Sequence, residues 1–462
     1  MSTHHQTIVV ELGCSRIKVG FAGESKPRHV LSGNDSSSGD GSWALGIDDG
    51  ICTSSCTWHR FYSYLSLSSP SSAADGKVLP KITTSYEWEK SLYPLFSYIL
   101  TSILFIQRPS RHRMLVLMSD IFPPQYLREA LLRVLLGYLN LGGVLLVNGG
   151  CFGSIQYLLE GMHNLSIPSV LSQPKASLVV DIGTNEARVA VSVPGSSFLA
   201  ETYQAIPAGY QTFLREVLIL YQKANEMKRD EAASEEDWTT TATLEDANTI
   251  VQAWITAPNT DLSATKNISV RLPSLLKQSN KLSDSSESSR AIQLSSLPLL
   301  EAFHQVYLDY SRPTSLTYAI LDSALASPID FRKAALQNVI LLGGGAVALR
   351  SFGKGLRIEL ENAIKVACGV SIDGNTQSKE EEKKDDGLDS SPIARRRFQC
   401  LRAAVASLHG SDEQAGVQIK YPQPFSPDLA HWLSGSVMGK LRLSNEDWIS
   451  DYSNVAGARA KG

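Results

Sequence analysis

Two short segments of the 462-residue sequence place an acidic residue two positions before a glycine, where a run of apolar residues ends. The first segment holds Glu11 and Gly13, and the second holds Asp181 and Gly183. An apolar pattern resumes after each glycine, so each segment predicts a hairpin with a tight turn. Backbone N–H groups at such a turn can converge on a phosphate, and glycine lets the ligand come close. The two carboxylates would then face each other across a cleft and hold a hydrated Mg²⁺ through its waters.

A third glycine element follows the apolar run Val339–Leu342 and consists of Gly343, Gly344 and Gly345. We expect a glycine turn here that passes under a nucleotide base. Any one of these elements is common in proteins that bind no nucleotide. Three of them in this order favour two duplicated lobes that share a nucleotide.

The elements that must position these motifs alternate between strand and helix patterns, which predicts α/β lobes with mixed sheets. Strands are expected at Thr7–Leu12, Ile17–Phe21, Met114–Met118, Val144–Val147, Ala176–Ile182, Ala187–Val193 and Val339–Leu342. Helices are expected at Pro124–Leu139, Phe152–Met162, Tyr210–Met227 and Ala430–Leu441.

The most apolar stretch, Leu92–Ile106, is shorter than the roughly 20 residues that a membrane span needs. We therefore expect a buried helix that ends before Arg108. The start of the sequence runs straight into a strand pattern and does not resemble a signal peptide.

The composition is that of a soluble globular protein, with 43% hydrophobic and 19% charged residues. A net charge of -3 argues against nucleic acid or membrane lipid as the main partner. No CxxC pair occurs, so we interpret the six cysteines as free thiols in a reducing compartment. They are Cys14, Cys52, Cys56, Cys151, Cys368 and Cys400.

Four segments are poor in the aromatic and β-branched residues that a packed core needs, and we expect them to be loops or insertions. They are Ser32–Gly50, Ser63–Gly76, Lys277–Arg290 and Thr376–Pro392. Arg395–Arg397 is a short basic run that suits either a localisation signal or a partner contact.

Five segments, in order, resemble conserved regions of the actin family. TIVVELGCSRIKVGFAGESKPR is similar to the first phosphate loop, and SLVVDIGTNEARVAVSV is similar to the second. The other three segments are residues 123–150, which resemble the part joining the lobes, 327–364, which resemble the adenosine loop, and 431–452, which resemble the C-terminal region. The resemblance implies an actin-like, ribonuclease H-like α/β fold with two duplicated lobes and a central nucleotide cleft.

The resemblance also implies which residues would contact ATP or ADP with its Mg²⁺. They are Glu11, Gly13, Cys14, Ser15, Lys18, Asp181, Gly183, Thr184, Gly343, Gly344 and Gly345. The same comparison assigns no catalytic residue and no direct metal ligand.

Several positions depart from the family pattern, and the departures bear on the chemistry. Glu11 replaces an aspartate, and Arg16 stands inside the first loop. In the second loop Thr184 and Asn185 replace an aspartate and a glycine. Arg133 takes the place of the glutamine that positions the attacking water, a group that hydrolysis needs.

Arg133 would instead pair with a phosphate or with Glu11, and Asn248 replaces a lysine that lies beside the adenosine in the family. We therefore expect a protein that is not an enzyme. Nucleotide would be held weakly or statically, or not at all.

The expected organisation follows the family order. Residues 1–175 form the first lobe, with an outer insertion at about 32–76. Residues 176–365 form the second lobe, with a divergent outer part at about 228–312. A charged, Ser-rich loop at 366–398 precedes a C-terminal segment, 399–462, that returns to the first lobe.

Within the family, the likeness is greatest to the actin-related protein at the pointed end of dynactin. It implies a cap on the dynactin actin-like filament that supports dynein-driven transport along microtubules, in the cytoplasm and on the cytoskeleton. The partners would be the filament-forming actin-related protein and other pointed-end subunits, with no nucleic acid, no membrane insertion and no homo-oligomer. Two alternatives remain open: a subunit of a nuclear chromatin-remodelling complex, and an active actin-type ATPase.

Overall fold

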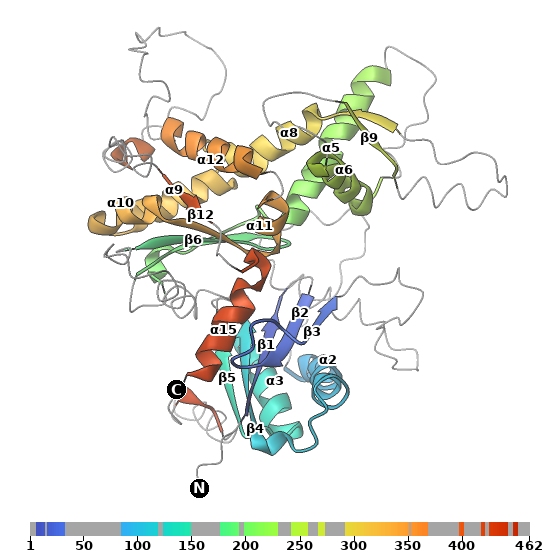
Figure 1. Cartoon of the computed structure of the whole chain (residues 1–462), viewed down its shortest axis with the longest axis vertical. Helices are drawn as coiled ribbons and strands as arrows, with labels where there is room; N and C mark the ends of the chain where they lie inside the picture. The colour runs from blue at the N-terminus through green and yellow to red at the C-terminus, as the bar shows by residue number, and fades with distance from the viewer. Residues whose placement is uncertain are drawn as a thin grey trace, which may run out of the picture. The chain divides into compact units, whose positions relative to one another are not determined.

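The computed structural model divides the chain into two compact units (Figure 1). Unit 1 comprises residues 1–173, 192–198 and 422–462, and unit 2 comprises residues 174–191 and 199–421. The residues described are 6–13, 16–32, 85–118, 123–148, 176–193, 198–229, 242–256, 267–272, 292–350, 353–367, 397–401, 417–420, 425–441 and 447–450.

Unit 1 contains a five-stranded mixed sheet in the order β3-β2-β1-β4-β5. Its strands are β1 (Gln6–Leu12), β2 (Arg16–Phe21), β3 (His29–Ser32), β4 (His112–Met118) and β5 (Gly143–Val147). Strand β2 is antiparallel to both of its neighbours, and β1, β4 and β5 run parallel. The expected strands of this region are confirmed.

The alternation of side chains along β1 decides what covers each face of this sheet. Ile8, Val10 and Leu12 lie in the core that helices α2 (Ser85–Tyr98) and α3 (Gln125–Leu132) complete. Val9 and Glu11 lie on the other face, where α15 (Ala430–Lys440) packs against β1 and β4 (Figure 1). The alternation therefore places Glu11 on the face that the C-terminal helix covers.

The apolar stretch that predicted a buried helix forms the end of α2 and a π-helical turn, η2 (Ile99–Ile103). Leu92, Phe96 and Ile99 are buried in the unit 1 core, so this prediction is confirmed. Within the described ranges, the helices fall short of the length and apolar character that crossing a membrane requires. The remaining short helices of unit 1 are η3 (Pro109–Arg111), η4 (Arg133–Tyr138) and η9 (Pro427–Leu429).

Unit 2 repeats the strand order of unit 1. Its larger sheet has the order β12-β11-β6-β7-β8, with β6 parallel to β11 and β11 parallel to β12. The strands are β6 (Ser177–Ile182), β7 (Ala187–Ser192), β8 (Gln204–Ile206), β11 (Val339–Leu342) and β12 (Ile419–Lys420). In both sheets the first strand of the unit lies at the centre and the next two follow outward on one side. The fold is mixed α/β, as predicted.

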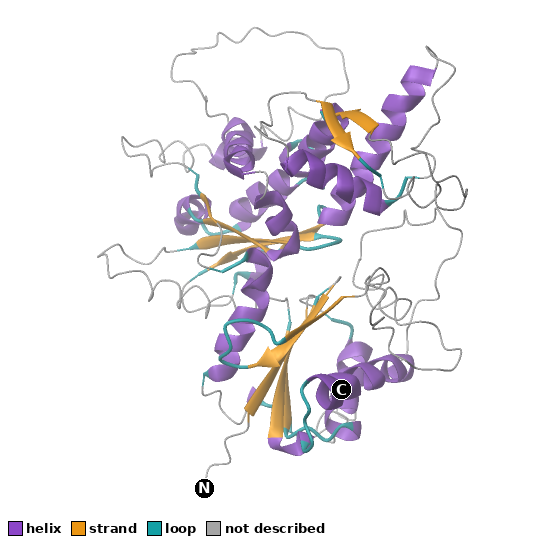
Figure 2. Ribbon diagram, turned by 45° about the vertical axis from the view of Figure 1, so that its right-hand side comes forward, coloured by secondary structure: helices purple, strands orange, loops and turns teal. Residues whose placement is uncertain are grey.

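The helices of unit 2 enclose a second core and carry a two-stranded sheet (Figure 2). The helices are η5 (Ala200–Thr202), α5 (Tyr210–Arg229), α6 (Leu244–Thr256), α8 (Leu297–Phe303), η7 (His304–Leu308), α9 (Leu316–Ala326), α10 (Ile329–Gln337), α11 (Gly343–Arg350), α12 (Gly353–Ala367) and η8 (Gln399–Leu401). The small sheet pairs β9 (Asn267–Val270) with β10 (Ile292–Ser295). Phe213, Phe303 and Tyr307 pack ring against ring at the centre of this core.

The segment 399–462 is divided between the two units. Residues 399–421 belong to unit 2, where β12 adds an edge strand to β11, and residues 422–462 belong to unit 1. The helix expected at Phe152–Met162 and the four low-complexity segments, apart from Ser32 in β3, lie outside the described residues. Of the short basic run, Arg397 is described and forms an ion pair with Asp322. Among the cysteines, Cys400 is described and is a free thiol.

Candidate functional site

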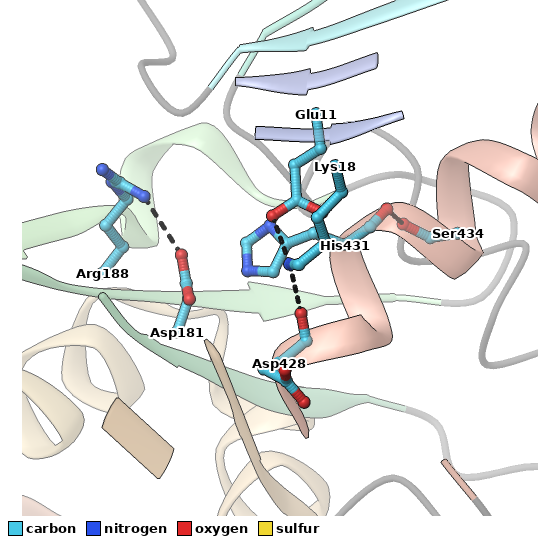
Figure 3. Close-up of polar contacts among 7 residues, drawn as sticks. All are labelled: Glu11, Lys18, Asp181, Arg188, Asp428, His431 and Ser434. Carbon is cyan, nitrogen blue, oxygen red and sulfur yellow. Dashed lines mark hydrogen bonds and ion pairs between the residues drawn. The ribbon is translucent and has the colours of Figure 1, made fainter. Parts of the chain in front are cut away.

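The acidic residue of the first hairpin forms a buried ion pair with a basic residue of the same hairpin. Glu11 at the end of β1 lies opposite Lys18 of β2 in the strand register. The Lys18 Nζ atom lies 2.7 Å from Glu11 Oε1, and both side chains are about nine-tenths buried (Figure 3). The turn closes through the N–H of Gly13, which donates to the carbonyl of Arg16 at 3.1 Å. Cys14 and Ser15, two of the predicted phosphate contacts, lie outside the described residues.

Lys18 makes a second, very short hydrogen bond to the backbone carbonyl of Asp428, just before α15. This bond ties β2 to a segment 410 residues further along the chain. Two of the three N–H donors of the ammonium group are thus used inside unit 1. The prediction that Lys18 contacts a phosphate stays a prediction, with one donor left for it.

The second carboxylate oxygen of Glu11 is buried, and no described residue hydrogen-bonds to it. A buried acceptor without a partner costs roughly 1–3 kcal/mol. Among the described residues of the first hairpin, this oxygen is therefore the one buried side-chain polar atom without a hydrogen-bond partner.

The second hairpin contains an equivalent ion pair. Arg188 Nη1 on β7 lies 3.1 Å from Asp181 Oδ2 at the end of β6, and both side chains are at most 5% exposed (Figure 3). The other end of the guanidinium group forms a short ion pair with Glu186 in the turn. Arg188 therefore bridges two carboxylates, which its planar fork of donors suits.

The turn of the second hairpin is joined to the start of helix α5. The N–H of Tyr210 donates to the carbonyl of Gly183 at 3.0 Å, and that of Gln211 donates to the carbonyl of Thr184 at 2.7 Å. The first N–H groups of a helix have no partner within the helix, and an anion is often bound there. Here two of these N–H groups, at the start of α5, donate to carbonyls in the turn between β6 and β7.

The three glycines do not form the free turn that the sequence predicted; they begin helix α11. Gly343 has a φ of +90°, and a Cβ atom there would lie 2.5 Å from Asp181 Oδ1. A Cβ atom on Gly345 would lie 2.4 Å from the Ile182 side chain, whereas Gly344 faces open space. The glycine run thus allows α11 to pack directly on the end of β6, because two of its positions have no room for a side chain.

The two hairpins share a pattern that the sequence reading missed. In each, the base follows the acid by seven positions and forms an ion pair with it. The spacing was visible in the sequence, since Lys18 follows Glu11 as Arg188 follows Asp181. We had singled out Lys18 for a phosphate contact and had not considered Arg188.

The ion pair predicted between Arg133 and Glu11 is wrong, because Arg133 pairs with Glu89, and a phosphate contact of Arg133 stays a prediction. Its Nη1 atom lies 2.7 Å from Oε1 of Glu89, and the hydroxyl of Tyr138 donates to the other oxygen of Glu89 at 3.0 Å. Glu89 is buried in α2, and Arg133 begins the π-helical turn η4. The pair joins two helices of unit 1, so Arg133 is committed to packing. The partners are 44 positions apart in the sequence, which explains why the sequence did not suggest this ion pair.

Asn248, the other substituted position, accepts a hydrogen bond from the Tyr210 hydroxyl at 2.8 Å. Burial raises the pKa of this phenol, so Tyr210 stays neutral and acts as the donor. The bond joins α5 to α6 within unit 2.

The residues present fit a Mg²⁺–nucleotide poorly. Water-mediated Mg²⁺ binding relies on carboxylates whose negative charge is not already offset by a neighbouring base. Glu11 and Asp181 are each neutralised by a base of the same hairpin. The described residues also contain no group of three His, Cys, Asp or Glu side chains arranged to hold a metal.

Neither a protein-family model nor a curated protein matches the sequence.

Proposed function

We propose that this chain is a non-catalytic actin-related assembly subunit. The observation that carries the proposal is the repeated hairpin, in which the acid at the end of the first strand is neutralised by a base seven residues later. The repeated strand order of the two sheets supports a duplicated actin-like architecture. The internal ion pairs support the loss of the metal-directed chemistry that such an architecture performs.

The loss of hydrolysis is supported by a second site. A nucleotide-hydrolysing subunit needs a side chain that orients water in line with the γ-phosphate. Arg133 stands where the family has that side chain, and it is held by buried Glu89. Nucleotide, if present, would serve as a static ligand.

The assembly role that we propose is a cap at the pointed end of the actin-like filament of dynactin, supporting dynein-driven transport in the cytoplasm. An actin-type filament grows through a heterologous contact between unlike faces. A subunit with one conserved and one altered face joins such a filament and stops it. The resemblance of residues 327–364 and 431–452 to the family, beside the divergent outer segments at about 32–76 and 228–312, supports this arrangement.

Co-purification tests the assembly role. A tagged full-length chain, expressed in cells of its source organism, is expected to recover the filament-forming actin-related protein and the other pointed-end subunits. Recovery of remodelling ATPases would instead support a nuclear chromatin complex. A variant that lacks residues 33–76 should still recover the filament, because this segment belongs to the altered face; its failure to do so would count against a cap.

Phosphate release tests the non-catalytic reading separately. The purified chain is expected to release no phosphate from ATP above the rate of a heat-denatured control. Arg133→Gln restores the family residue, and it should remain inactive because both hairpin acids stay paired. Release at a rate typical of assembled actin would favour the ATPase alternative.

A further inference from the structure

Two turns in unit 1 have the same backbone geometry but contrasting residues at the critical position. The first follows η2, where the N–H groups of Leu104 and Ile106 donate to the carbonyls of Ile99 and Leu100 at 2.9 and 2.7 Å. Phe105, between the two donors, has a φ of +52°. This is the left-handed conformation that ends many helices and usually falls to glycine or asparagine.

The second turn follows η4, and it closes in the same way. The N–H groups of Leu139 and Leu141 donate to the carbonyls of Val134 and Leu135 at 2.9 and 3.0 Å. The residue between the donors is Asn140, with a φ of +51°. Asparagine tolerates this conformation because its short side chain hydrogen-bonds locally. The comparison shows which residue this turn accommodates without strain.

Phenylalanine at position 105 is unfavourable for two reasons, the strain of its backbone and the exposure of its side chain. A bulky residue in the left-handed region is strained, and strain of this kind is retained where something else requires it. Phe105 is also 79% exposed, the largest exposure among the described large apolar side chains. Packing inside unit 1 therefore does not explain why Phe105 is there.

The stretch of sequence that contains Phe105 is basic. Between Lys90 and Asp120 the sequence contains no aspartate or glutamate, but it contains three arginines. Arg108 and Arg111 are exposed, and the guanidinium group of Arg113 lies over the Trp448 ring at 5.2 Å. An aromatic side chain beside arginines is the composition that protein interfaces favour at their energetic centre.

We propose that Phe105 and Arg108 form a docking surface for a folded protein partner whose apolar pocket is rimmed by carboxylates. The hydrogen-bonded turn fixes the direction of the ring before binding, which lowers the entropy lost on association. A membrane surface is a poorer match, because anchoring there needs several apolar side chains or a larger basic cluster. The inference goes beyond the proposed cap, and it holds for whichever assembly the chain joins.

Photo-crosslinking of the full-length chain in its own cells tests the surface. Phe105 is replaced by p-benzoylphenylalanine, which keeps an aromatic ring at the position. The expected product is an adduct to one protein, through a peptide that carries aspartate or glutamate near the attachment point. Arg108→Glu in the same chain should reduce the adduct by about tenfold, the effect of one lost charge-assisted contact. The same crosslinker at Ile219, 41% exposed in unit 2, is the control and should not capture that protein.

Stability measurements separate an interface role from a structural one. Phe105→Asn copies the residue of the second turn, so the melting temperature should rise by roughly 2–4 °C while recovery of the crosslinked partner is lost. The reverse change, Asn140→Phe, should lower the melting temperature by a similar amount. A Phe105→Asn chain that is less stable, or that still recovers the partner, overturns the proposal. A lipid adduct, the absence of any adduct, or an adduct unchanged by Arg108→Glu does so as well.

Discussion

The two hairpins perform the same neutralisation with different chemistry. In unit 1, Lys18 joins one carboxylate, Glu11, to a backbone carbonyl. In unit 2, Arg188 joins two carboxylates, Asp181 and Glu186. One cation therefore offsets one charge in the first hairpin and two in the second. The difference teaches that the two units share the position of the base, seven residues after the acid, and not its residue type.

The hairpins also differ in what they are attached to. The first depends on a segment near the C-terminus, because Asp428 supplies the second acceptor of Lys18. The second is supported locally by the start of α5, which follows it closely in sequence. Loss of the cation should therefore have unequal effects in the two units.

The largest effect is expected from Arg188→Met, which removes the cation that pairs with buried Asp181 and with partly buried Glu186. Removal of one partner of a buried ion pair destabilises a protein by about 3–5 kcal/mol, and here the upper end applies. Hydrogen exchange followed by mass spectrometry should show the loss in the β6–β7 peptides and spare those of β1–β2. Adding Asp181→Asn should restore part of the protection; no restoration would mean that Arg188 acts through packing alone.

Lys18→Met should have a smaller effect, because it leaves one carboxylate uncompensated instead of two. We expect a loss of about 3 kcal/mol, localised to unit 1. The same exchange measurement should show that the β1–β2 peptides and α15 lose protection together, because Lys18 bonds to Glu11 in β1 and to Asp428 directly before α15. If α15 keeps its protection, the bond to Asp428 contributes nothing to holding the C-terminal segment.

Gly343→Ala tests how closely the glycine run approaches Asp181. The added Cβ atom would lie 2.5 Å from the carboxylate and would require a left-handed backbone, so we expect a loss of about 2 kcal/mol. Gly344→Ala is the matched control, because its Cβ atom meets nothing within 4 Å. Thermal unfolding of the two variants should separate them in opposite directions, since alanine at an open helical position is favourable.

The smallest effect concerns alkaline pH, where unit 2 should be the weaker unit. Burial raises the pKa of both Tyr221 and Tyr307. The folded state favours the neutral phenols, so stability that is complete below pH 10 is lost as the pH rises above it, by about 1.4 kcal/mol per pH unit for each tyrosine.

Tyr307→Phe isolates one of these groups, because no described residue hydrogen-bonds to its hydroxyl. At pH 7 it should raise the free energy of unfolding by about 1 kcal/mol, because it removes a buried hydroxyl that no described residue hydrogen-bonds. Between pH 10 and pH 11 it should reduce the loss by about 1 kcal/mol, as urea titrations would measure. Equal slopes for the variant and the parent chain would contradict the assignment.

Seven strands of the two sheets were predictable because each is a run of apolar residues bounded by turn residues, whereas the short edge strands β3, β8 and β12 were not predicted. Thr7–Leu12 and Ala176–Ile182 could hardly form anything else, and the alternation in β1 already separates Ile8 and Val10 from Glu11. The local sequence pattern was sufficient to predict a strand wherever burial of both faces of that strand determined the structure.

The site was less predictable, because its contacts depend on residues far apart in the chain. Nothing near Arg133 indicates Glu89, and nothing near Lys18 indicates Asp428. The glycine run was misread for a different reason: glycine suits a turn, and it equally suits a helix that must lie directly on a strand. Only the neighbouring Asp181 and Ile182 decide between these.

The position of α15 has a consequence for the synthesis of the chain. Strand β1 ends at Leu12 and leaves the ribosome early, but the helix that covers one of its faces begins at Ala430. At roughly 5–20 residues per second, the first unit waits about 20–80 s for its covering helix. Throughout that interval Val9 and the Glu11–Lys18 pair lack the partner that shields them, so the nascent chain is most vulnerable to misassociation at the part that was made first.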